Sequence, residues 1–395
     1  MPETIAAPLC VDGRMLYHSG TGVSTYARIL HRVQVELGER SGALIASPSR
    51  LPPALGAIGR HVRKTKLAVV AETGAYKLTA TDIFKRAHIH FGMHGKLLPV
   101  SPALPFGIMH WTYPVPLYFQ RWINIYAVHD VIPITQPDLS PVSADRLAKT
   151  LQAISRIADA ITTISDASSR EISALDIFDR NRIINASLAI ECQLSPVPDP
   201  SEVLTAVGLH HKGYLLFSGS VEERKNVRRM LAAYRQAKVT MPLVIVGPTT
   251  TGGRYIEEDI RSTPGAVRLP YQTREALDAL VTGAHALIFP SLAEGFGLPV
   301  IEAMGRGTAV LTSRIPAISE ISGDAALLAD PTDVDDLARA IRMLATDRVL
   351  ADTLASRGIE RAALYSFDRF SRQIANVYRH ALSRRAESLG TNRTT

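Results

Sequence analysis

The sequence of 395 residues contains only two cysteines, Cys10 and Cys192. Two cysteines cannot form a disulfide framework, and neither belongs to a pair with the spacing of metal ligands. The sequence therefore predicts a protein of a reducing compartment, the cytoplasm, without structural disulfides.

Long apolar runs are also lacking. No uninterrupted stretch of about 18 apolar residues occurs, so no membrane-spanning helix is predicted. The first residues, "MPETIAAPLCVDGR", contain no basic region followed by an apolar run, and we expect no secretory signal.

Acidic residues are fewer than basic ones, which gives a formal net charge of +7. Residues 60–86 contain seven Lys and Arg against two Asp and Glu, and this segment holds the whole basic surplus of residues 1–195. Such a segment could rest on an anionic membrane surface as a peripheral contact, or it could be a solvated helical face.

Short β-rich runs alternate with helical stretches along the chain, a pattern typical of parallel sheets covered on both faces. In the first half, we predict strands at 8–16, 42–48, 87–92, 123–130 and 160–165, and helices at 22–38, 143–158 and 166–175. In the second half, we predict strands at 214–220, 242–248, 266–271, 286–291, 309–313 and 326–330, and helices at 225–238, 273–282, 299–306, 317–322 and 333–346.

This pattern predicts an α/β fold of two doubly wound, Rossmann-like domains. The prolines of "LSPVPDPSEV" (194–203) cannot join a sheet and indicate a stiff connector. We assign 1–195 to the first domain, 196–212 to the linker and 213–366 to the second domain. Residues 367–395 would form a C-terminal helix, which could cross back to the first domain, and a disordered tail, "SLGTNRTT".

The segment "AEGFGLPVIEAMGRG" follows the predicted strand at 286–291, and ligands bind at the carboxyl edge of such sheets. Gly295 and Gly297 can adopt positive φ, and a helix beginning near Pro299 offers unpaired N–H groups to phosphate. The carboxylates of Glu294 and Glu302 can accept hydrogen bonds from hydroxyls. A ligand with phosphates between two hydroxyl-bearing ends, such as a nucleotide sugar, would fit, although a capped helix with two surface acids is the plainer alternative.

A second segment, "FSGSVEERKNVRRML", places Arg224 and Lys225 just after the first strand of the second domain. Two cations there could neutralise a diphosphate as its negative charge grows during departure. Taken alone, the segment could equally be a solvated basic turn.

Together with "VIVGP" and "ISEISGDAALLADPTD", these segments resemble glycosyltransferase family 4, retaining enzymes of the GT-B fold whose two Rossmann-like domains face each other across a cleft. The resemblance implies that Glu294 contacts the donor sugar, that Glu302 binds the ribose, and that Arg224 and Lys225 hold the diphosphate. The further donor-binding positions that it implies are Gly219, Gly295, Phe296, Gly297 and Leu298, with Arg268 and Leu269 at the edge of the base. The family often has glycine where this chain has Pro270 and Tyr271.

The first half resembles the family more loosely. In "HSGTGVSTYARIL", the resemblance implies that Gly20 and Gly22 let a loop close on the donor phosphates. Thr25 replaces the last glycine of a dinucleotide fingerprint, so no nicotinamide site is expected.

"YAVHDVIPI" resembles the bacterial mannosyltransferase-like branch of this family, which implies that His129 lies beside the transferred sugar and that Asp130 fixes the local geometry. A lone histidine is more often structural. His110 and Tyr113, in an aromatic-rich stretch, are candidates for acceptor binding, and a packed aromatic wall is the alternative.

The activity expected from the resemblance is transfer of a hexose, mannose from GDP-mannose as the best guess, to a hydroxyl of a saccharide with retained anomeric configuration. UDP-glucose, GDP-rhamnose and dTDP-rhamnose are alternative donors. The acceptor would be a saccharide or a polyprenyl-diphosphate-linked oligosaccharide in the synthesis of cell-surface polysaccharide or lipopolysaccharide. A sugar-nucleotide epimerase and a non-catalytic nucleotide-binding protein are other possible functions.

No metal or other cofactor is expected, since no Asp-x-Asp motif is placed to bind a metal, and "DVDD" at 333–336 is a predicted helix start. His88, His90 and His94 lack a further ligand for zinc, although His88 and His90 would share a strand face. No nucleic-acid partner is expected.

Overall fold

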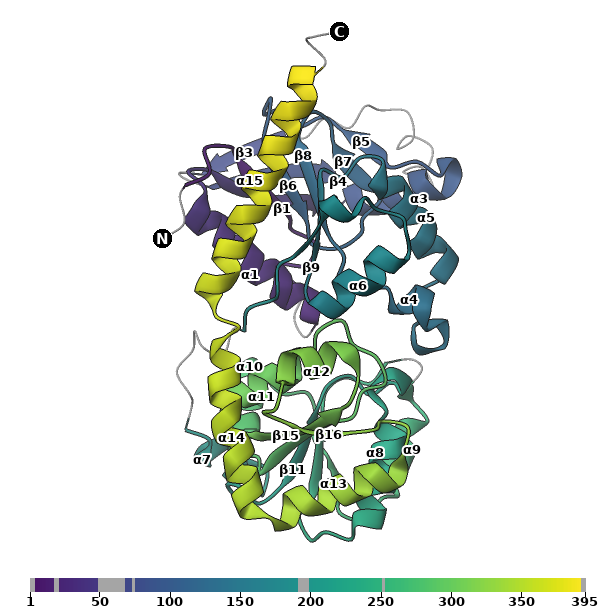
Figure 1. Cartoon of the computed structure of the whole chain (residues 1–395), viewed down its shortest axis with the longest axis vertical. Coiled ribbons are helices and arrows are strands. Elements are labelled where there is room, and N and C mark those ends of the chain that lie inside the picture. The colour runs from purple at the N-terminus through teal and green to yellow at the C-terminus, as the bar shows by residue number, and fades with distance from the viewer. Residues whose placement is uncertain are drawn as a thin grey trace. The chain divides into compact units, whose positions relative to one another are not determined.

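The computed structural model describes residues 4–17, 21–48, 68–72, 75–190, 199–250 and 253–391. The chain forms two compact units (Figure 1). The first contains residues 1–137, 141–189 and 367–395, and the second contains residues 138–140 and 190–366. Each unit is an α/β structure built on its own sheet, so the predicted fold class is confirmed.

The first unit has an eight-stranded sheet with the order β10-β9-β8-β6-β1-β2-β4-β3. Among its described strands, only β3 pairs in the antiparallel direction, with β4. The bounds are β1 Leu9–Asp12, β2 Ser41–Ser47, β3 Ala68–Glu72, β4 Ala75–Thr81, β6 Ile108–Trp111, β8 Ile123–Ala127, β9 Ala160–Thr163 and β10 Ile183–Asn185, with β5 Leu98–Val100 and β7 Leu117–Phe119 in a separate parallel pair.

The helices of this unit are α1 Gly22–Leu37, α3 Ile83–His94, α4 Ile132–Thr135, α5 Ala144–Ser155, α6 Asp166–Ala174 and α15 Phe367–Thr391, with 3-10 turns at Pro137–Leu139 and Arg180–Arg182. The predicted helices at 22–38, 143–158 and 166–175 are thereby confirmed. Thr21 begins α1 because its side chain accepts a hydrogen bond from the Ser24 amide at 3.2 Å. Ser165 caps α6 in the same way through the Ser168 amide, at 3.0 Å.

Helix α15 packs beside α1 in the first unit. Gln34 of α1 donates a hydrogen bond to the Tyr378 hydroxyl of α15 at 2.8 Å, and both side chains are buried. The guanidinium of Arg32 lies 4.4 Å from the ring centroid of Phe367. The last helix is therefore part of the first unit.

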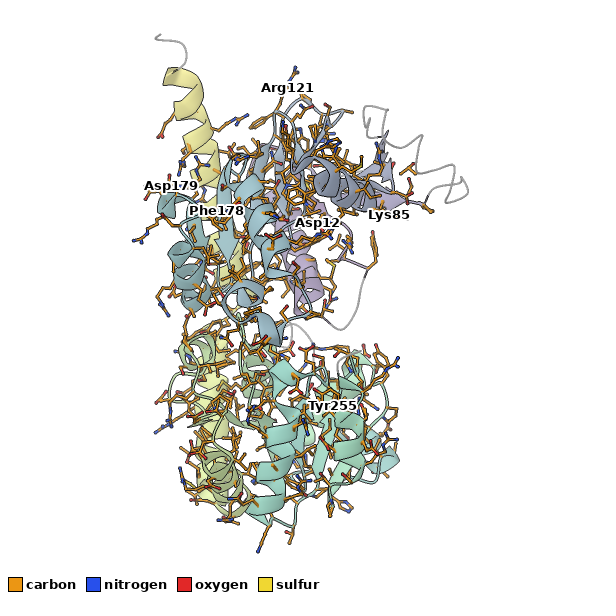
Figure 2. The ribbon with its side chains drawn as sticks, turned by 90° about the vertical axis from the view of Figure 1, so that its right-hand side faces the viewer. Asp12, Lys85, Arg121, Phe178, Asp179 and Tyr255 are labelled. Carbon is orange, nitrogen blue, oxygen red and sulfur yellow. The ribbon has the colours of Figure 1, made fainter. Side chains whose placement is uncertain are left out.

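The aromatic-rich stretch forms much of the first unit's core on the side of α3 and α5. Trp111 and Trp122 are fully buried, and Trp111 stacks on Tyr126 with ring centroids 5.9 Å apart. These rings form a packed aromatic wall. Figure 2 shows the density of side chains in this unit, with Asp12 inside it and Lys85 of α3 pointing outward.

The second unit has a six-stranded parallel sheet with the order β13-β12-β11-β14-β15-β16. Its strands are β11 Leu215–Ser218, β12 Leu243–Val246, β13 Ala266–Arg268, β14 Ala286–Phe289, β15 Ala309–Ser313 and β16 Leu327–Ala329. Its helices are α7 Ser201–Ala206, α8 Val227–Ala237, α9 Ile256–Arg261, α10 Arg274–Gly283, α11 Leu298–Gly305, α12 Pro316–Ser322, α13 Val334–Thr346 and α14 Arg348–Ala363, with a 3-10 turn at Glu223–Lys225. The structure confirms all six predicted strands. They were predictable because continuous apolar runs are typical of buried parallel strands.

Some predictions of local structure are wrong. Residues 87–92 lie in α3, since Ile83, Phe84, Ala87 and Phe91 recur at helical spacing and enter the core. His88 and His90 therefore do not share a strand face. Residues 388–391, expected in a disordered tail, continue α15.

The predicted linker at 196–212 contains α7. Residues 60–67 and 73–74 of the basic segment lie outside the described residues, as do Gly20 and Cys192. The rest of the basic segment forms β3, β4 and the start of α3. No helix in the described ranges is long and apolar enough to cross a membrane.

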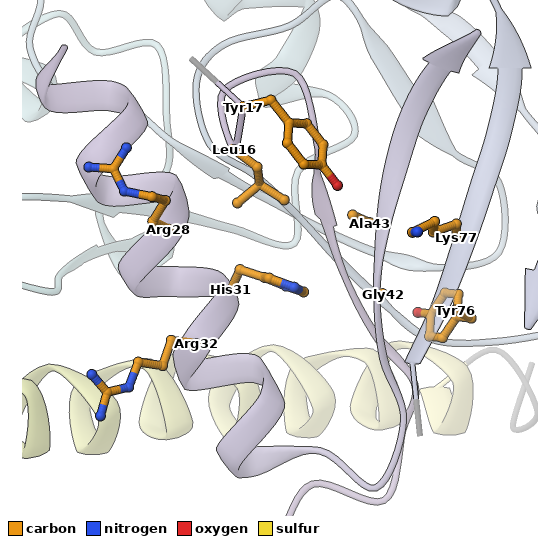
Figure 3. A pocket seen from close by; sticks show the side chains of 9 residues that line it. All are labelled: Leu16, Tyr17, Arg28, His31, Arg32, Gly42, Ala43, Tyr76 and Lys77. Carbon is orange, nitrogen blue, oxygen red and sulfur yellow. The ribbon is translucent and has the colours of Figure 1, made fainter. Parts of the chain in front are cut away.

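A cavity of about 310 Å³ lies in the first unit between α1 and the strands β2 and β4 (Figure 3). Its walls include His31 of α1, Gly42 and Ala43 of β2, and Tyr76 and Lys77 of β4. These strand residues stand at or near the first positions of β2 and β4. The cavity is therefore nearer to the amino ends of these two strands than to their carboxyl ends.

Candidate active site

The loop between β14 and α11 lies at the carboxyl edge of the second unit's sheet. Gly297 precedes the helix with φ +108°, and a Cβ atom there would lie 2.4 Å from Cδ1 of Ile318. Glycine therefore fits this position without backbone strain and without moving the Ile318 side chain. Pro299 stands in the first turn of α11, where its missing N–H group costs little.

Glu294 of this loop is held by two cations from the turn after β11. Lys225 donates a hydrogen bond from Nζ to Oε1 at 2.5 Å, and Arg224 donates from Nη1 to Oε2 at 3.0 Å. Arg224 also donates to the carbonyl oxygen of Ala293 at 2.9 Å. The side chains of Glu294 and Lys225 are each only 10% exposed. The prediction assigned these groups to different parts of one ligand, and the structure joins them in one buried ion cluster.

The electrostatics of the cluster keep Glu294 ionised. Burial alone would raise the pKa of Glu294, but the charges of Lys225 and Arg224 outweigh burial and hold it below its ordinary value. The Lys225 ammonium also lies over the Phe289 ring, 4.7 Å from its centroid. Both cations are thus fixed at the edge of the sheet instead of moving freely in solvent.

Glu222 is a member of this cluster that the sequence reasoning missed. It accepts a hydrogen bond from Nη2 of Arg224 at 2.9 Å. The sequence feature that could have indicated this role is its position, two residues before Arg224 in "VEERKN". The two acids and two bases of the cluster balance in formal charge, so the cations are oriented while the local charge stays low.

Glu302 lies one turn into α11, and Arg274 of α10 donates a hydrogen bond to its Oε1 at 2.9 Å. Arg274 also pairs with Asp278 at 3.1 Å, and Asp278 pairs with the buried Arg306 at 2.9 Å. A chain of ion pairs therefore fixes the orientation of Glu302. No motif in the sequence linked Arg274 to Glu302, because the two residues belong to different helices.

Arg268 binds the ends of the neighbouring strands. Its guanidinium donates hydrogen bonds to the carbonyl oxygens of Ile245 and Leu269, at 3.2 and 3.0 Å, and also to that of Gly247. Its Nε lies 3.1 Å from a carboxylate oxygen of Glu257, and Leu269 is buried. These contacts give Arg268 a supporting role at the place where the base of a nucleotide was expected.

The strand ends at this edge also approach one another closely. Gly247 has φ +134°, and a Cβ atom there would lie 2.0 Å from the carbonyl oxygen of Gly219. This approach requires glycine at position 247. Gly219 directly follows β11, as expected from the motif around it.

In the first unit, His129 and Asp130 follow the end of β8. His129 donates a hydrogen bond from Nε2 to the carbonyl oxygen of Thr112 at 2.7 Å, and the ring of Tyr26 packs edge-on at 4.8 Å between centroids. Burial lowers the pKa of His129, although the Thr112 carbonyl and Asp130 oppose this shift. Asp130 accepts a hydrogen bond from the amide of Ile132 at 3.1 Å and thereby fixes the turn into α4.

His110 is fully buried and joins three elements of the first unit. Its Nε2 lies 3.2 Å from the Tyr26 hydroxyl and 3.0 Å from that of Thr162, and its Nδ1 lies 3.2 Å from the Tyr378 hydroxyl. Burial lowers the pKa of His110 to about 3, so the ring is neutral. The expected contact with an acceptor does not fit this position, because no part of the ring is exposed.

Tyr113, the other acceptor candidate, is only partly buried, and its hydroxyl accepts a hydrogen bond from Nη1 of Arg14 at 2.8 Å. Gly22 is the first residue of α1.

Within the described residues, no group of three or more His, Cys, Asp or Glu side chains is placed to hold a metal ion.

Two Rossmann-like units, one with an ion cluster and a glycine-started helix at its carboxyl edge, have the architecture expected of the GT-B fold. Comparisons with known proteins agree. Residues 207–361 match the family model "Glycosyl transferases group 1". O-antigen chain mannosyltransferase B of Escherichia coli is 34% identical over 282 residues, which cover 67% of this chain and 72% of that protein. The chain therefore belongs to the glycosyl transferases group 1 family, and it is similar to the bacterial mannosyltransferases of this family.

A second relative, the serotype-specific mannosyltransferase WbdA of Escherichia coli, is 25% identical over 276 residues; the match covers 65% of this chain and 33% of WbdA. Among solved structures, sucrose-phosphate synthase of Thermosynechococcus elongatus has a TM-score of 0.70 at 18% identity, covering 95% of this chain and 99% of that one. HepE of Anabaena, solved with UDP and glucose, has a TM-score of 0.66 at 15% identity, covering 96% and 99%. These structural likenesses establish the shared fold.

Proposed function

We propose that this glycosyltransferase transfers mannose from GDP-mannose to a hydroxyl of a saccharide, with retention of the anomeric configuration, in the synthesis of a cell-surface polysaccharide. The main support is the ion cluster of Arg224, Lys225 and Glu294 beside the start of α11. The mannose assignment rests on the segment from His129 to Pro133 and on relatives that are named O-antigen mannosyltransferases.

The second unit binds the donor in this proposal. Arg224 and Lys225 hold the diphosphate together with backbone N–H groups of Gly295, Phe296 and Gly297. Glu294 accepts hydrogen bonds from sugar hydroxyls, and Glu302 accepts them from the ribose. Both carboxylates already have fixed orientations, which reduces the cost of ordering them on binding. Gly219, Leu298 and Leu269 complete the proposed donor contacts, with Arg268 supporting the backbone near the base.

In the proposed reaction, the bond between the anomeric carbon and the diphosphate oxygen breaks, and a bond from the acceptor oxygen to the same carbon forms on the same face. The acceptor's proton passes to the leaving diphosphate. Because negative charge grows on the diphosphate, Arg224 and Lys225 stabilise the transition state more than the ground state. His129 is assigned to the transferred sugar.

The proposed acceptor is a saccharide or a polyprenyl-diphosphate-linked oligosaccharide, bound by the first unit. A lipid-linked acceptor would place the protein in the cytoplasm at the inner face of the membrane, with the basic segment 60–86 as a peripheral contact. Flotation with anionic liposomes tests this contact. A protein that stays at the bottom of the gradient would argue against it.

A donor screen tests the proposed function. GDP-mannose, UDP-glucose, GDP-rhamnose and dTDP-rhamnose are compared by thermal shift and by hydrolysis of the donor. A ligand at one hundred times its Kd adds about 2.7 kcal/mol of stability, which corresponds to roughly 5–10 °C for a unit of this size. We expect this shift with GDP-mannose. A shift with another donor alone would overturn the mannose assignment, and conversion to an epimerised nucleotide sugar without transfer would overturn the reaction.

A further inference from the structure

Three basic side chains from distant parts of the sequence gather at the carboxyl edge of the first unit's sheet. Arg14 lies in the turn after β1, His88 lies in α3, and Arg146 lies in the first turn of α5. Nη2 of Arg146 is 3.3 Å from Nδ1 of His88. The pKa of His88 is lowered by burial and then by the charges of Arg146 and Arg14, so both arginines act on this ring.

Neither arginine has an acidic partner at ion-pair distance among the described residues. The partner of Arg14 is the Tyr113 hydroxyl, at 2.8 Å, with the guanidinium 5.6 Å from the Tyr113 ring centroid. The acid nearest in sequence to Arg146, Asp145, pairs with Lys149 at 2.8 Å. The charges of Arg146 and Arg14 both act on His88, and an anion bound beside this ring would offset them.

Tyr113 connects this basic group to His129. Thr112, the preceding residue, donates its amide to Oδ2 of the fully buried Asp12 at 2.5 Å and accepts the His129 hydrogen bond on its carbonyl oxygen. One dipeptide after β6 therefore fixes both His129 and the tyrosine that holds Arg14. A ligand group bound by Arg14 would lie at the same edge of the sheet as His129.

We propose that Arg14, His88, Arg146 and Tyr113 bind a phosphoryl group carried by the acceptor substrate. This inference deepens the proposed function and rests on it, since it names the chemistry of the acceptor. The planar guanidinium of arginine can donate two parallel hydrogen bonds to the oxygens of a phosphoryl group. A phosphoryl dianion neutralises two arginine charges, whereas a carboxylate neutralises only one. The hydroxyl of Tyr113 can donate to the same group while it accepts from Arg14.

The cavity of Figure 3 is also lined by basic side chains, and it fits a phosphoryl group less well. Its lining includes Arg28 and Arg32, but their guanidinium groups point away from the strands, and only His31 points from α1 toward them (Figure 3). Arg32 also pairs with Glu36 at 3.5 Å. The cavity lies beside the first residues of β2 and β4, whereas His129 follows the last residue of β8. Because these strands are parallel, the cavity lies toward the opposite edge of the sheet from His129.

The test titrates the full chain with pyrophosphate and follows the imidazole NMR signal of His88. This signal is assigned by its absence from the spectrum of the H88Q variant. A bound phosphoryl group should shift this signal with a saturating curve. R14Q and R146Q should weaken the affinity read from it by roughly tenfold or more, the range for a hydrogen bond to a charged group. The matched control is K149Q, which removes one positive charge from the same helix, one turn away. Equal weakening by K149Q, or an unmoved His88 signal, would overturn the proposal, as would R28Q if it alone abolished binding.

A second measurement identifies the source of the phosphoryl group. Wild type and R146Q are sedimented with phosphatidylcholine vesicles that do or do not contain a polyprenyl diphosphate. Retention of wild type by the diphosphate vesicles and its loss in R146Q would support a lipid-linked acceptor. Binding of soluble pyrophosphate without retention would support a soluble phosphorylated acceptor. Donor hydrolysis, measured separately, should be the same in K149Q and wild type. If neither protein hydrolyses the donor, the result would count against the proposed transfer while leaving the phosphoryl site standing.

Discussion

Replacing Lys225 by methionine tests the ion cluster most directly, because it removes one charge and keeps an apolar stem of similar length. The Nζ of Lys225 is 2.5 Å from Oε1 of Glu294, and both side chains are 10% exposed. Removing one partner of a buried ion pair typically costs 3–5 kcal/mol, since the other charge is left buried. Arg224 keeps its contact with Glu294 at 3.0 Å, so we take the lower end, about 3 kcal/mol. That loss lowers the Tm of the second unit by roughly 6–12 °C.

The pH dependence of this loss gives a sharper test. The pKa of Glu294 is below its ordinary value of 4.5 in the folded protein, so the carboxylate stabilises the fold above that pH and loses this contribution as the pH falls through the folded pKa. In K225M, only Arg224 opposes the effect of burial, so the pKa of Glu294 is higher than in wild type. Protonation then relieves the incompletely paired charge as the pH falls. The difference in Tm between K225M and wild type should therefore be large near pH 7.5 and should shrink toward pH 4.5.

Differential scanning calorimetry at several pH values measures both effects. The control is the double variant K225M/E294Q, which should recover part of the lost stability, because no buried carboxylate is left without its lysine. A difference in Tm that is below about 2 °C near pH 7.5, or that does not change with pH, would refute the ion cluster, since the expected loss is several times larger. K225M should also lower kcat by roughly 10²–10³, the range for one lost donor to a developing negative charge.

Three further predictions concern the donor site and the metal. G297A should lose about 1–3 kcal/mol of stability, because the added methyl group would overlap Ile318 and the backbone has φ +108°; a thermal melt like that of wild type would contradict this. E302Q should weaken nucleotide binding by roughly tenfold in calorimetry, because it removes a charged acceptor for the ribose and the partner of Arg274. E320Q, a change on α12, is its control and should bind nucleotide as wild type does. Transfer should continue in EDTA, and activity that disappears and returns with Mn²⁺ would show that a metal takes part.

The fold of the second unit was largely predictable from its sequence. Its strands are short and largely apolar, and each is followed within three residues by glycine or proline, so local pattern and tertiary burial agree. In the first unit, the apolar residues around His88 alternate over a few positions, a pattern that predicts a strand. Its helical spacing becomes visible only when Ile83 and Phe84 are included, since short apolar runs fit either period.

The candidate site was predictable where one motif carries all of its parts. Glu294, Gly297 and Glu302 stand in one segment, and their order along the loop and helix is fixed by the chain. The partners of these residues come from other elements. Arg274 meets Glu302 only because α10 and α11 are neighbours, and sequence spacing has no information about such contacts.

The first unit is discontinuous in sequence, because α15 belongs to it while residues 190–366 form the second unit. During synthesis, the second unit can therefore be complete before the first, which waits for Phe367 and Tyr378 to emerge from the ribosome. The hydrogen bond between Gln34 and Tyr378 closes a loop of more than 300 residues, and such closure is entropically costly unless the intervening chain is already compact. Early folding of the second unit would shorten the effective loop, so the second unit would assist the folding of the first.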